Sequence, residues 1–195
     1  MTNQTTQTNN RVFRIVERFG IAPAGVFSAT LSSFAFLGEH TRKIKKDDKE
    51  EERTCEYVGL EYEFLDKNTG EVHKVMTECT LSCSPDSNFY EHIIALNDGK
   101  PLEEGQAFDV LLGKSARIEI IHRKTKADSG VEREYANIKA VHVLTDKVNA
   151  HKLIEKPVFY DVLKPNPDAF SKLNRKHQFI IGKRNGGDAE MKAAA

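Results

Sequence analysis

Residues 55–83 read CEYVGLEYEFLDKNTGEVHKVMTECTLSC, and this stretch decides the fold because two alternating segments flank a short turn sequence. The first segment alternates apolar and polar residues, which is the period of a strand with one buried face. Its apolar face holds Val58, Leu60, Tyr62 and Phe64. Residues 66–71, DKNTGE, have the Asn and Gly content of a hairpin turn. The second segment places Val75, Thr77, Cys79 and Leu81 on its inward face, so we predict an antiparallel β-hairpin.

Upstream, GVFSATLSSFAFLGE at residues 25–39 also alternates and predicts a strand with Phe27, Ala29 and Leu31 inward. Between this strand and the hairpin, HTRKIKKDDKEEER at residues 40–53 packs eleven charged side chains into fourteen positions. We expect this segment to be a charged loop, basic at its start and acidic at its end.

Downstream, PDSNFYEHIIALNDG at residues 85–99 changes to a helical period. It predicts a short amphipathic helix with Asp86 or Ser87 as N-cap and an end at residues 97–99. The apolar face of this helix holds Phe89, Ile93 and Leu96. Two further strands follow at residues 114–125 and 134–144, and the first of them points Ala116, Ile118 and Ile120 inward.

This order of elements predicts a mainly β fold, a five-stranded Greek-key barrel of the oligonucleotide/oligosaccharide-binding (OB) type with one helix between strands 3 and 4. The alternative is another five-stranded barrel or sandwich. We expect three parts: a flexible N-terminal arm at 1–19, the barrel at 20–145, and a partly irregular C-terminal extension at 146–195. The extension holds apolar clusters at 158–163 and 179–181, so we expect it to fold back over the barrel or to dock on another protein. A short helix is predicted from Asp168 to about Lys176.

Composition sets limits on the class of protein. No apolar run approaches the roughly 18 residues that cross a bilayer, and the polar start MTNQTTQTNN does not predict a signal peptide. Three cysteines are too few for a disulfide framework, which favours a reducing, cytoplasmic setting. The net charge is zero, but residues 54–110 carry 3 Lys and Arg against 12 Asp and Glu, whereas residues 111–144 carry 7 against 4. The charge is therefore separated along the chain.

Basic residues from the two long loops of the predicted barrel favour a polyanion, because cations near a groove neutralise phosphates and release counterions. The first loop contributes His40, Arg42, Lys43, Lys45 and Lys46, and the second contributes Lys124, Lys126 and Arg133. Three outward strand positions, Lys74, Arg117 and Arg123, extend this candidate surface. The alternative for the first loop is a solvated surface segment of mixed charge.

Aromatic side chains supply the second signal, because single-stranded nucleic acid is held by bases that stack on exposed rings. Tyr57 lies on the polar face of its strand, and the neighbouring Gly59 leaves room for a base or a backbone to approach. Strict alternation would also expose Phe34 and Phe36, whereas a single β-bulge would turn both rings into the core.

Catalysis has little support, because no phosphate-binding loop, nucleophile elbow or paired-histidine metal motif is present. A zinc site from the cysteines and His92 is disfavoured, since Cys79 and Cys83 fall on an apolar strand face. Glu61, Glu63 and Glu78 are outward carboxylates that a metal-dependent nuclease would use, but no lysine stands at a recognisable spacing. We predict no enzyme, no cofactor and no metal.

The phrases PAGVFSATL, YVGLEYEFLDKNTGE, SNFYEHIIALNDG and GQAFDVLLGKSARIEII together resemble phage-encoded single-stranded DNA-binding proteins of the OB fold, over roughly residues 20–145. The resemblance implies sequence-independent protection of single strands during phage replication or recombination, in the cytoplasm of an infected bacterial host. Many such proteins end in an acidic tail that recruits replication enzymes, whereas residues 145–195 carry 10 Lys and Arg against 6 Asp and Glu.

Three functions follow in order. The first is non-catalytic binding of single-stranded DNA, with RNA left open and with replication or recombination proteins as partners of the extension. The second is a structural or protein-recognition barrel, such as a virion component or an adaptor, and the third is a metal-dependent nuclease. A membrane partner is not expected, and the oligomeric state is left open.

Overall fold

The computed structural model describes residues 21–46, 49–126 and 132–184 of the 195-residue chain. Its strands are β1 (Gly25–Lys46), β2 (Lys49–Leu65), β3 (Val72–Thr80), β4 (Ser115–Lys126), β5 (Glu132–Val143) and β6 (Val158–Asp161). Its α-helices are α1 (Asn88–Leu96), α2 (Pro167–Lys172) and α3 (Arg175–Gly182), and short 3₁₀ turns cover Phe108–Leu111 and Lys147–Asn149.

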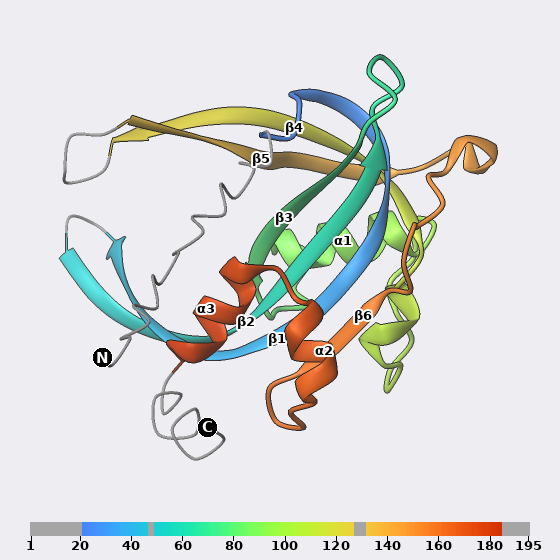
Figure 1. The fold of residues 1–195 in the computed structure, drawn as a ribbon. Coiled ribbons are helices and arrows are strands. Elements are labelled where there is room, and N and C mark those ends of the chain that lie inside the picture. The colour runs from blue at the N-terminus through green and yellow to red at the C-terminus, as the bar shows by residue number, and fades with distance from the viewer. Residues whose placement is uncertain (1–20, 47–48, 127–131, 185–195) are drawn as a thin grey trace, which may run out of the picture.

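The five predicted strands are confirmed, and they form one antiparallel sheet in the order β3-β2-β1-β4-β5 (Figure 1). The helix predicted between the third and fourth strands is also confirmed. A closed barrel is not observed: within the described ranges β3 and β5 end the sheet and are not paired with each other. The fold is therefore an open, strongly curved sheet. Among the described helices, none is long and apolar enough to span a bilayer.

The charged segment 40–53 is not a loop, so this prediction was wrong. β1 and β2 continue through it as a hairpin that turns at residues 47–48, which lie outside the described part of the chain. Its basic and acidic halves face each other across the strands, for example as Lys43 opposite Glu52. Opposite charges on neighbouring strands stabilise such a pair, so the charge pattern that suggested a loop is compatible with a strand.

Two bulges in β1 explain where its phenylalanines lie. The register with β2 shifts between Leu31 and Ser33 and again between Phe36 and Gly38. The first shift turns Phe34 to the core side, where it is fully buried and contacts the Phe36, Phe89 and Phe108 rings. The same shift turns Ala35 to the opposite, outer face of the sheet, where it is also fully buried.

α1 closes the inner side of the curved sheet. Ser87 is its N-cap, with a side-chain oxygen that accepts a hydrogen bond from the Tyr90 backbone N–H at 3.2 Å. The helix ends at Asn97, and the residues that follow, Asp98 and Gly99, have φ of 57° and 82°. Its apolar face packs into the main core, which also holds the four predicted inward residues of β2.

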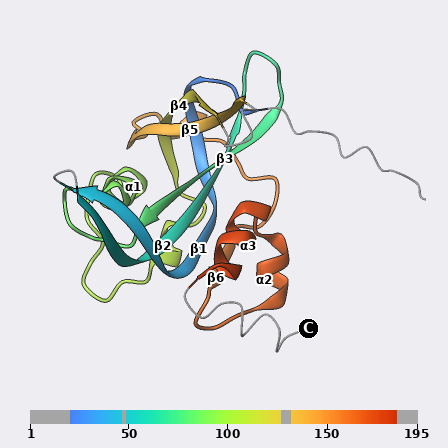
Figure 2. The same ribbon diagram turned by 90° about the vertical axis from the view of Figure 1, so that its left-hand side faces the viewer.

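The C-terminal extension folds back over the outer face of the sheet, one of its two expected outcomes. β6 pairs with β1 in parallel, and α2 and α3 follow. The two views agree that α1 lies on one side of β1 and β2 and that α2 and α3 lie on the other (Figures 1 and 2). The single predicted helix from Asp168 to Lys176 is instead two helices, because Asn174 is extended and caps α3 by accepting from the His177 N–H at 2.8 Å.

Candidate nucleic-acid interface

The β1–β2 and β4–β5 hairpins are the two segments from which the candidate surface was predicted. Both extend beyond the core toward the same side of the molecule, at the left of Figure 1. In Figure 2, which looks from that side, the β1–β2 hairpin lies at the left and the β4–β5 hairpin at the top. Two cationic segments distant in sequence are thus presented on one side of the fold.

The outer face of the β4–β5 hairpin gathers an aromatic ring and two guanidinium groups. Arg123 lies directly opposite Tyr135, and Thr125 lies directly opposite Arg133. Strand alternation places all four side chains on one face. Tyr135 is 45% exposed, and both arginines are exposed. We name this set, Arg123, Arg133 and Tyr135, the β4–β5 station.

Tyr135 was missed by the sequence prediction, although both arginines of the station were named. Its position on the outer face depends on the register of β4 with β5, which shifts between Glu119 and Ile120. The alternation of residues 134–144 alone does not show which arginines the ring will meet.

The remaining basic residues of this hairpin lie elsewhere on it. Lys124 and Lys126 occupy the opposite face, where Glu134 and Glu132 face them across the strands. Arg117 is exposed on the same face of β4 as Arg123, three alternating positions closer to the core. The predicted set therefore divides into an arginine-rich face and a face of mixed charge.

In the β1–β2 hairpin, Arg42 is held by two contacts. Its guanidinium carbon lies 4.1 Å from the centre of the Tyr57 ring, and it forms an ion pair with Glu78 at 3.5 Å. Lys43 forms an exposed ion pair with Glu50 at 3.9 Å. The side chains of Lys45 and Lys46 lie outside the described residues. This hairpin is thus less strongly cationic than its sequence suggested, because carboxylates pair with its lysines.

Three predicted members of the surface are unsuited to it. His40 is 8% exposed, and burial lowers the pKa of its imidazole, so it is neutral at pH 7. Phe34 is fully buried, and Phe36 is partly buried and packed against the core. A base has no access to the Phe34 ring, and His40 carries no charge for a phosphate.

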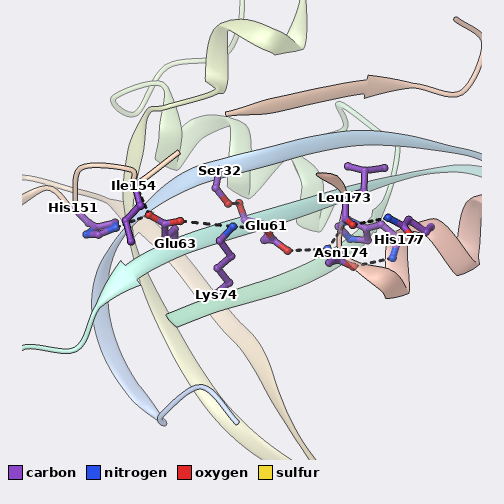
Figure 3. A network of polar contacts seen from close by, with 10 residues as sticks. Ser32, Glu61, Glu63, Lys74, His151, Ile154, Leu173, Asn174 and His177 are labelled. Atoms are coloured by element: carbon purple, nitrogen blue, oxygen red, sulfur yellow. Dashed lines mark hydrogen bonds and ion pairs between the residues drawn. The ribbon is translucent and has the colours of Figure 1, made fainter. Parts of the chain in front are cut away.

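The outer face of β2 differs most from its prediction (Figure 3). Glu61 and Glu63 were expected to face solvent, but they are 8% and 2% exposed. Lys74 lies 3.6 Å from Glu61 and 3.7 Å from Glu63. It was predicted to follow a phosphate backbone, but these two carboxylates neutralise it.

Both carboxylates tie the extension to the sheet. The Glu63 Oε1 atom accepts from the Ile154 backbone N–H and from His151 Nε2, each at 2.9 Å. Burial opposes ionisation of Glu63, but these hydrogen bonds and Lys74 outweigh it and lower its pKa. The Glu61 Oε2 atom accepts from the Asn174 side-chain amide at 2.9 Å. All four carboxylate oxygens therefore have protein partners.

The space predicted beside Gly59 is filled. A Cβ atom at this position would lie 2.5 Å from the His177 Nε2 atom. The His177 ring is fully buried, and burial lowers its pKa to about 4, so it packs as a neutral side chain. No base approaches β2 here unless α3 moves away.

Two pockets lie along this outer surface. A groove of about 1000 Å³ runs between β3 and the extension, and its lining includes Glu61, Glu63, Glu71 and Glu155. A smaller pocket of about 260 Å³ lies at the base of the β1–β2 hairpin. Its lining residues are Arg42, Arg53, Cys55, Tyr57, Thr80, Ser82 and Ser87, and it includes no carboxylate.

The structure supplies the lysine that the nuclease alternative lacked, since Lys74 contacts both Glu61 and Glu63. However, those carboxylates already have partners. Within the described ranges, no group of three or more His, Cys, Asp and Glu side chains is placed to hold a metal ion. Burial raises the pKa of the Cys79 thiol to about 11, which makes it a poor thiolate donor at neutral pH.

Comparison of the chain with protein-family models, curated proteins and solved structures gives no match.

Proposed function

We propose that this protein binds single-stranded DNA without catalysis and largely without sequence preference, and that the β4–β5 station is its main contact. The observation that carries the proposal is the exposed Tyr135 ring between two exposed arginines. A ring offers a stacking surface to any base, and guanidinium groups pair with the phosphates on either side of it. Neither contact reads a base sequence.

Strand order supports the same proposal. The path β3-β2-β1-β4-β5, with a helix between β3 and β4, is that of an OB-type sheet that has not closed. The resemblance to phage single-stranded DNA-binding proteins points to replication or recombination. We infer from both that the sheet is an open variant of this fold and that its two hairpins flank the bound strand.

A titration of labelled oligo-dT by fluorescence anisotropy at several salt concentrations tests the proposal. Wild type is expected to bind with micromolar or tighter affinity, to lose affinity steeply with salt, and to bind duplex less well. Tyr135→Ala is expected to cost on the order of 1–3 kcal/mol of binding free energy, whereas Tyr135→Phe keeps a stacking ring and most of the affinity.

The opposite face of the hairpin provides a matched control. Arg123→Ala with Arg133→Ala removes two charges from the station, and the slope of log K against log salt should fall by about 1.4. Lys124→Ala with Lys126→Ala removes the same charge from the other face and should change the slope less. Equal effects of the two double variants, or an unchanged affinity in Tyr135→Ala, would contradict the proposal.

A protein-recognition role is the second candidate, favoured by apolar side chains that the extension leaves exposed. Val148, Leu163 and Phe179 are 94%, 81% and 61% exposed. A gel-filtration shift with a protein partner, together with no retardation of single strands, would favour this role over DNA binding.

A further inference from the structure

The small pocket at the base of the β1–β2 hairpin has a chemistry unlike that of the larger groove. Two of its seven lining side chains are arginines, three carry hydroxyl groups, and none is acidic. It lies where three strands meet the N-cap of α1, since Arg42 belongs to β1, Arg53 to β2, Thr80 to β3, and Ser87 is the cap. A pocket with only cationic, hydroxyl, thiol and phenol groups selects an anion.

Arg42 and Arg53 are directly opposite each other on β1 and β2. Like charges at such a position destabilise a sheet, and an anion bound between them removes the repulsion. The nearby acidic pair, Glu39 opposite Glu56, falls on the other face of the hairpin by strand alternation. The two guanidinium groups therefore face the pocket without a carboxylate on their own side of this pair of strands.

Arg42 is held in place in this pocket. It lies over Tyr57 at 4.1 Å and beside Glu78 at 3.5 Å. Glu78 also contacts Lys176 at 2.6 Å, so one negative charge serves two cations. Arg53 is exposed and, within the described part of the chain, forms no ion pair shorter than 4.0 Å. Together with Arg53, the Arg42–Glu78–Lys176 cluster leaves an excess of positive charge around the pocket.

We propose that this pocket binds one phosphate group of a single-stranded nucleic acid, held between Arg42 and Arg53 and by the Thr80 and Ser82 hydroxyl groups. Tyr57 and Glu78 are positioning residues, because they act on the phosphate only through Arg42. The proposal rests on the proposed function and adds a second contact point to it. A strand that crosses the β4–β5 station then has a fixed phosphate position at the other hairpin.

Two measurements test this proposal on the full chain. In the first, the ¹⁵Nε–Hε resonances of arginine are followed by NMR during addition of thymidine 5′-monophosphate, thymidine or inorganic phosphate. The Arg42 and Arg53 resonances are expected to shift with the monophosphate and to stay in place with thymidine. A response to inorganic phosphate as large as that to the monophosphate assigns the site to the phosphate group alone, which also supports the proposal.

The second measurement is the oligo-dT titration with Arg53→Ala, which leaves the Arg42 contacts intact. Its slope of log K against log salt should fall by about 0.7, and its affinity by several-fold. Arg175→Ala removes the same charge from the carboxylate-rich groove and serves as the control, with a slope equal to that of wild type.

An Arg53→Ala slope equal to that of wild type, or arginine resonances that do not move with the monophosphate, would overturn the proposal. Failure of the proposed function is a different result: Tyr135→Ala and the Arg123 and Arg133 double variant would leave strand binding unchanged. If the protein binds no strand at all, the monophosphate titration still decides whether the pocket takes a phosphate.

Discussion

At the scale of single residues, Gly59 shows how closely the extension is fitted to the sheet. Its backbone is in contact with the His177 ring, at a distance that no side chain larger than hydrogen permits. The same glycine would have admitted a base to the outer face of β2, as its sequence suggested. Its small size instead admits α3, so the residue serves packing.

Gly59→Ala is expected to lower the free energy of unfolding by about 1–3 kcal/mol, because the new methyl group overlaps the imidazole and forces α3 outward. Urea denaturation of Gly59→Ala, His177→Ala and the double variant forms a cycle that isolates the overlap. The double variant should be more stable than the sum of the two single losses predicts. Strict additivity would show that the overlap is relieved without cost.

Buried histidines make stability depend on pH. Burial lowers the pKa of His92, whose Nδ1 lies 2.7 Å from the Tyr62 hydroxyl, to about 4, and it lowers that of His177 to about 4. In the folded state both stay neutral below pH 6.5, whereas in the unfolded chain they take up a proton. Stability is therefore complete above pH 6.5 and falls as the pH drops toward 4.

Lowering the pH from 7.5 to 5 is expected to cost on the order of 2 kcal/mol for each of these two histidines. Urea denaturation at the two pH values measures the loss, and His92→Gln should remove about half of it. Glu63 does not obscure the result, because its lowered pKa affects stability only at more acidic pH. His142→Gln, at an exposed position, is the control. A loss of equal size in His92→Gln and wild type would refute this account.

At the scale of elements, the extension is attached through buried carboxylates on β2. Glu63 alone joins the 151–154 segment to the sheet through His151 and the Ile154 backbone. Glu61 joins the α2–α3 junction through Asn174. Each carboxylate thus fixes a different part of the extension, so the parts should loosen separately.

Glu63→Gln keeps the shape of the side chain but weakens its bonds to His151 and Lys74. We expect faster amide hydrogen exchange at residues 150–156, little change in α3, and a loss of about 1–3 kcal/mol of stability. Glu71→Gln changes an exposed carboxylate in the same groove and should alter neither. Uniform acceleration of exchange over the whole extension would contradict separate attachment.

Alternation in the sequence predicted the elements well, because β2 buries all four of its predicted inward side chains and α1 begins at the predicted Ser87 cap. It failed where pairing decides the outcome. The β1 bulges, the strand pairing of residues 40–53 and the lack of closure between β3 and β5 all depend on contacts distant in sequence. Polar residues such as Glu63 look solvent-facing until a covering segment supplies partners.

For the site, the sequence identified the cations but not their surroundings. Arg123 and Arg133 were predicted and lie together, whereas Lys74 was predicted and lies between two carboxylates. Tyr135 needed the β4–β5 register to reveal its neighbours. Charge and residue type can be read from a sequence, but whether a charge is already paired is a property of the fold.

At the scale of the whole molecule, the extension forms a second core on the outer face of β1. Ala35 and Leu37 of β1 pack there with Tyr160, Val162 and Ile181, and all five are buried. Without the extension, these two β1 side chains and the backbone edge contacted by β6 would meet solvent next to the two buried carboxylates of β2. The sheet then has an exposed apolar patch, which favours self-association.

A chain that ends at Asp146 is therefore expected to unfold at lower urea concentration than the full chain and to form oligomers at micromolar concentration. Light scattering after gel filtration and urea denaturation measure both effects. A peptide of residues 147–184, added in trans, should restore a monomer-sized complex, because β6 and α3 supply the missing contacts. The β4–β5 station lies outside this contact, so oligo-dT affinity in the restored complex should match that of the full chain. A shortened chain that stays monomeric with an unchanged urea midpoint would show that the outer core contributes nothing to the stability of the sheet.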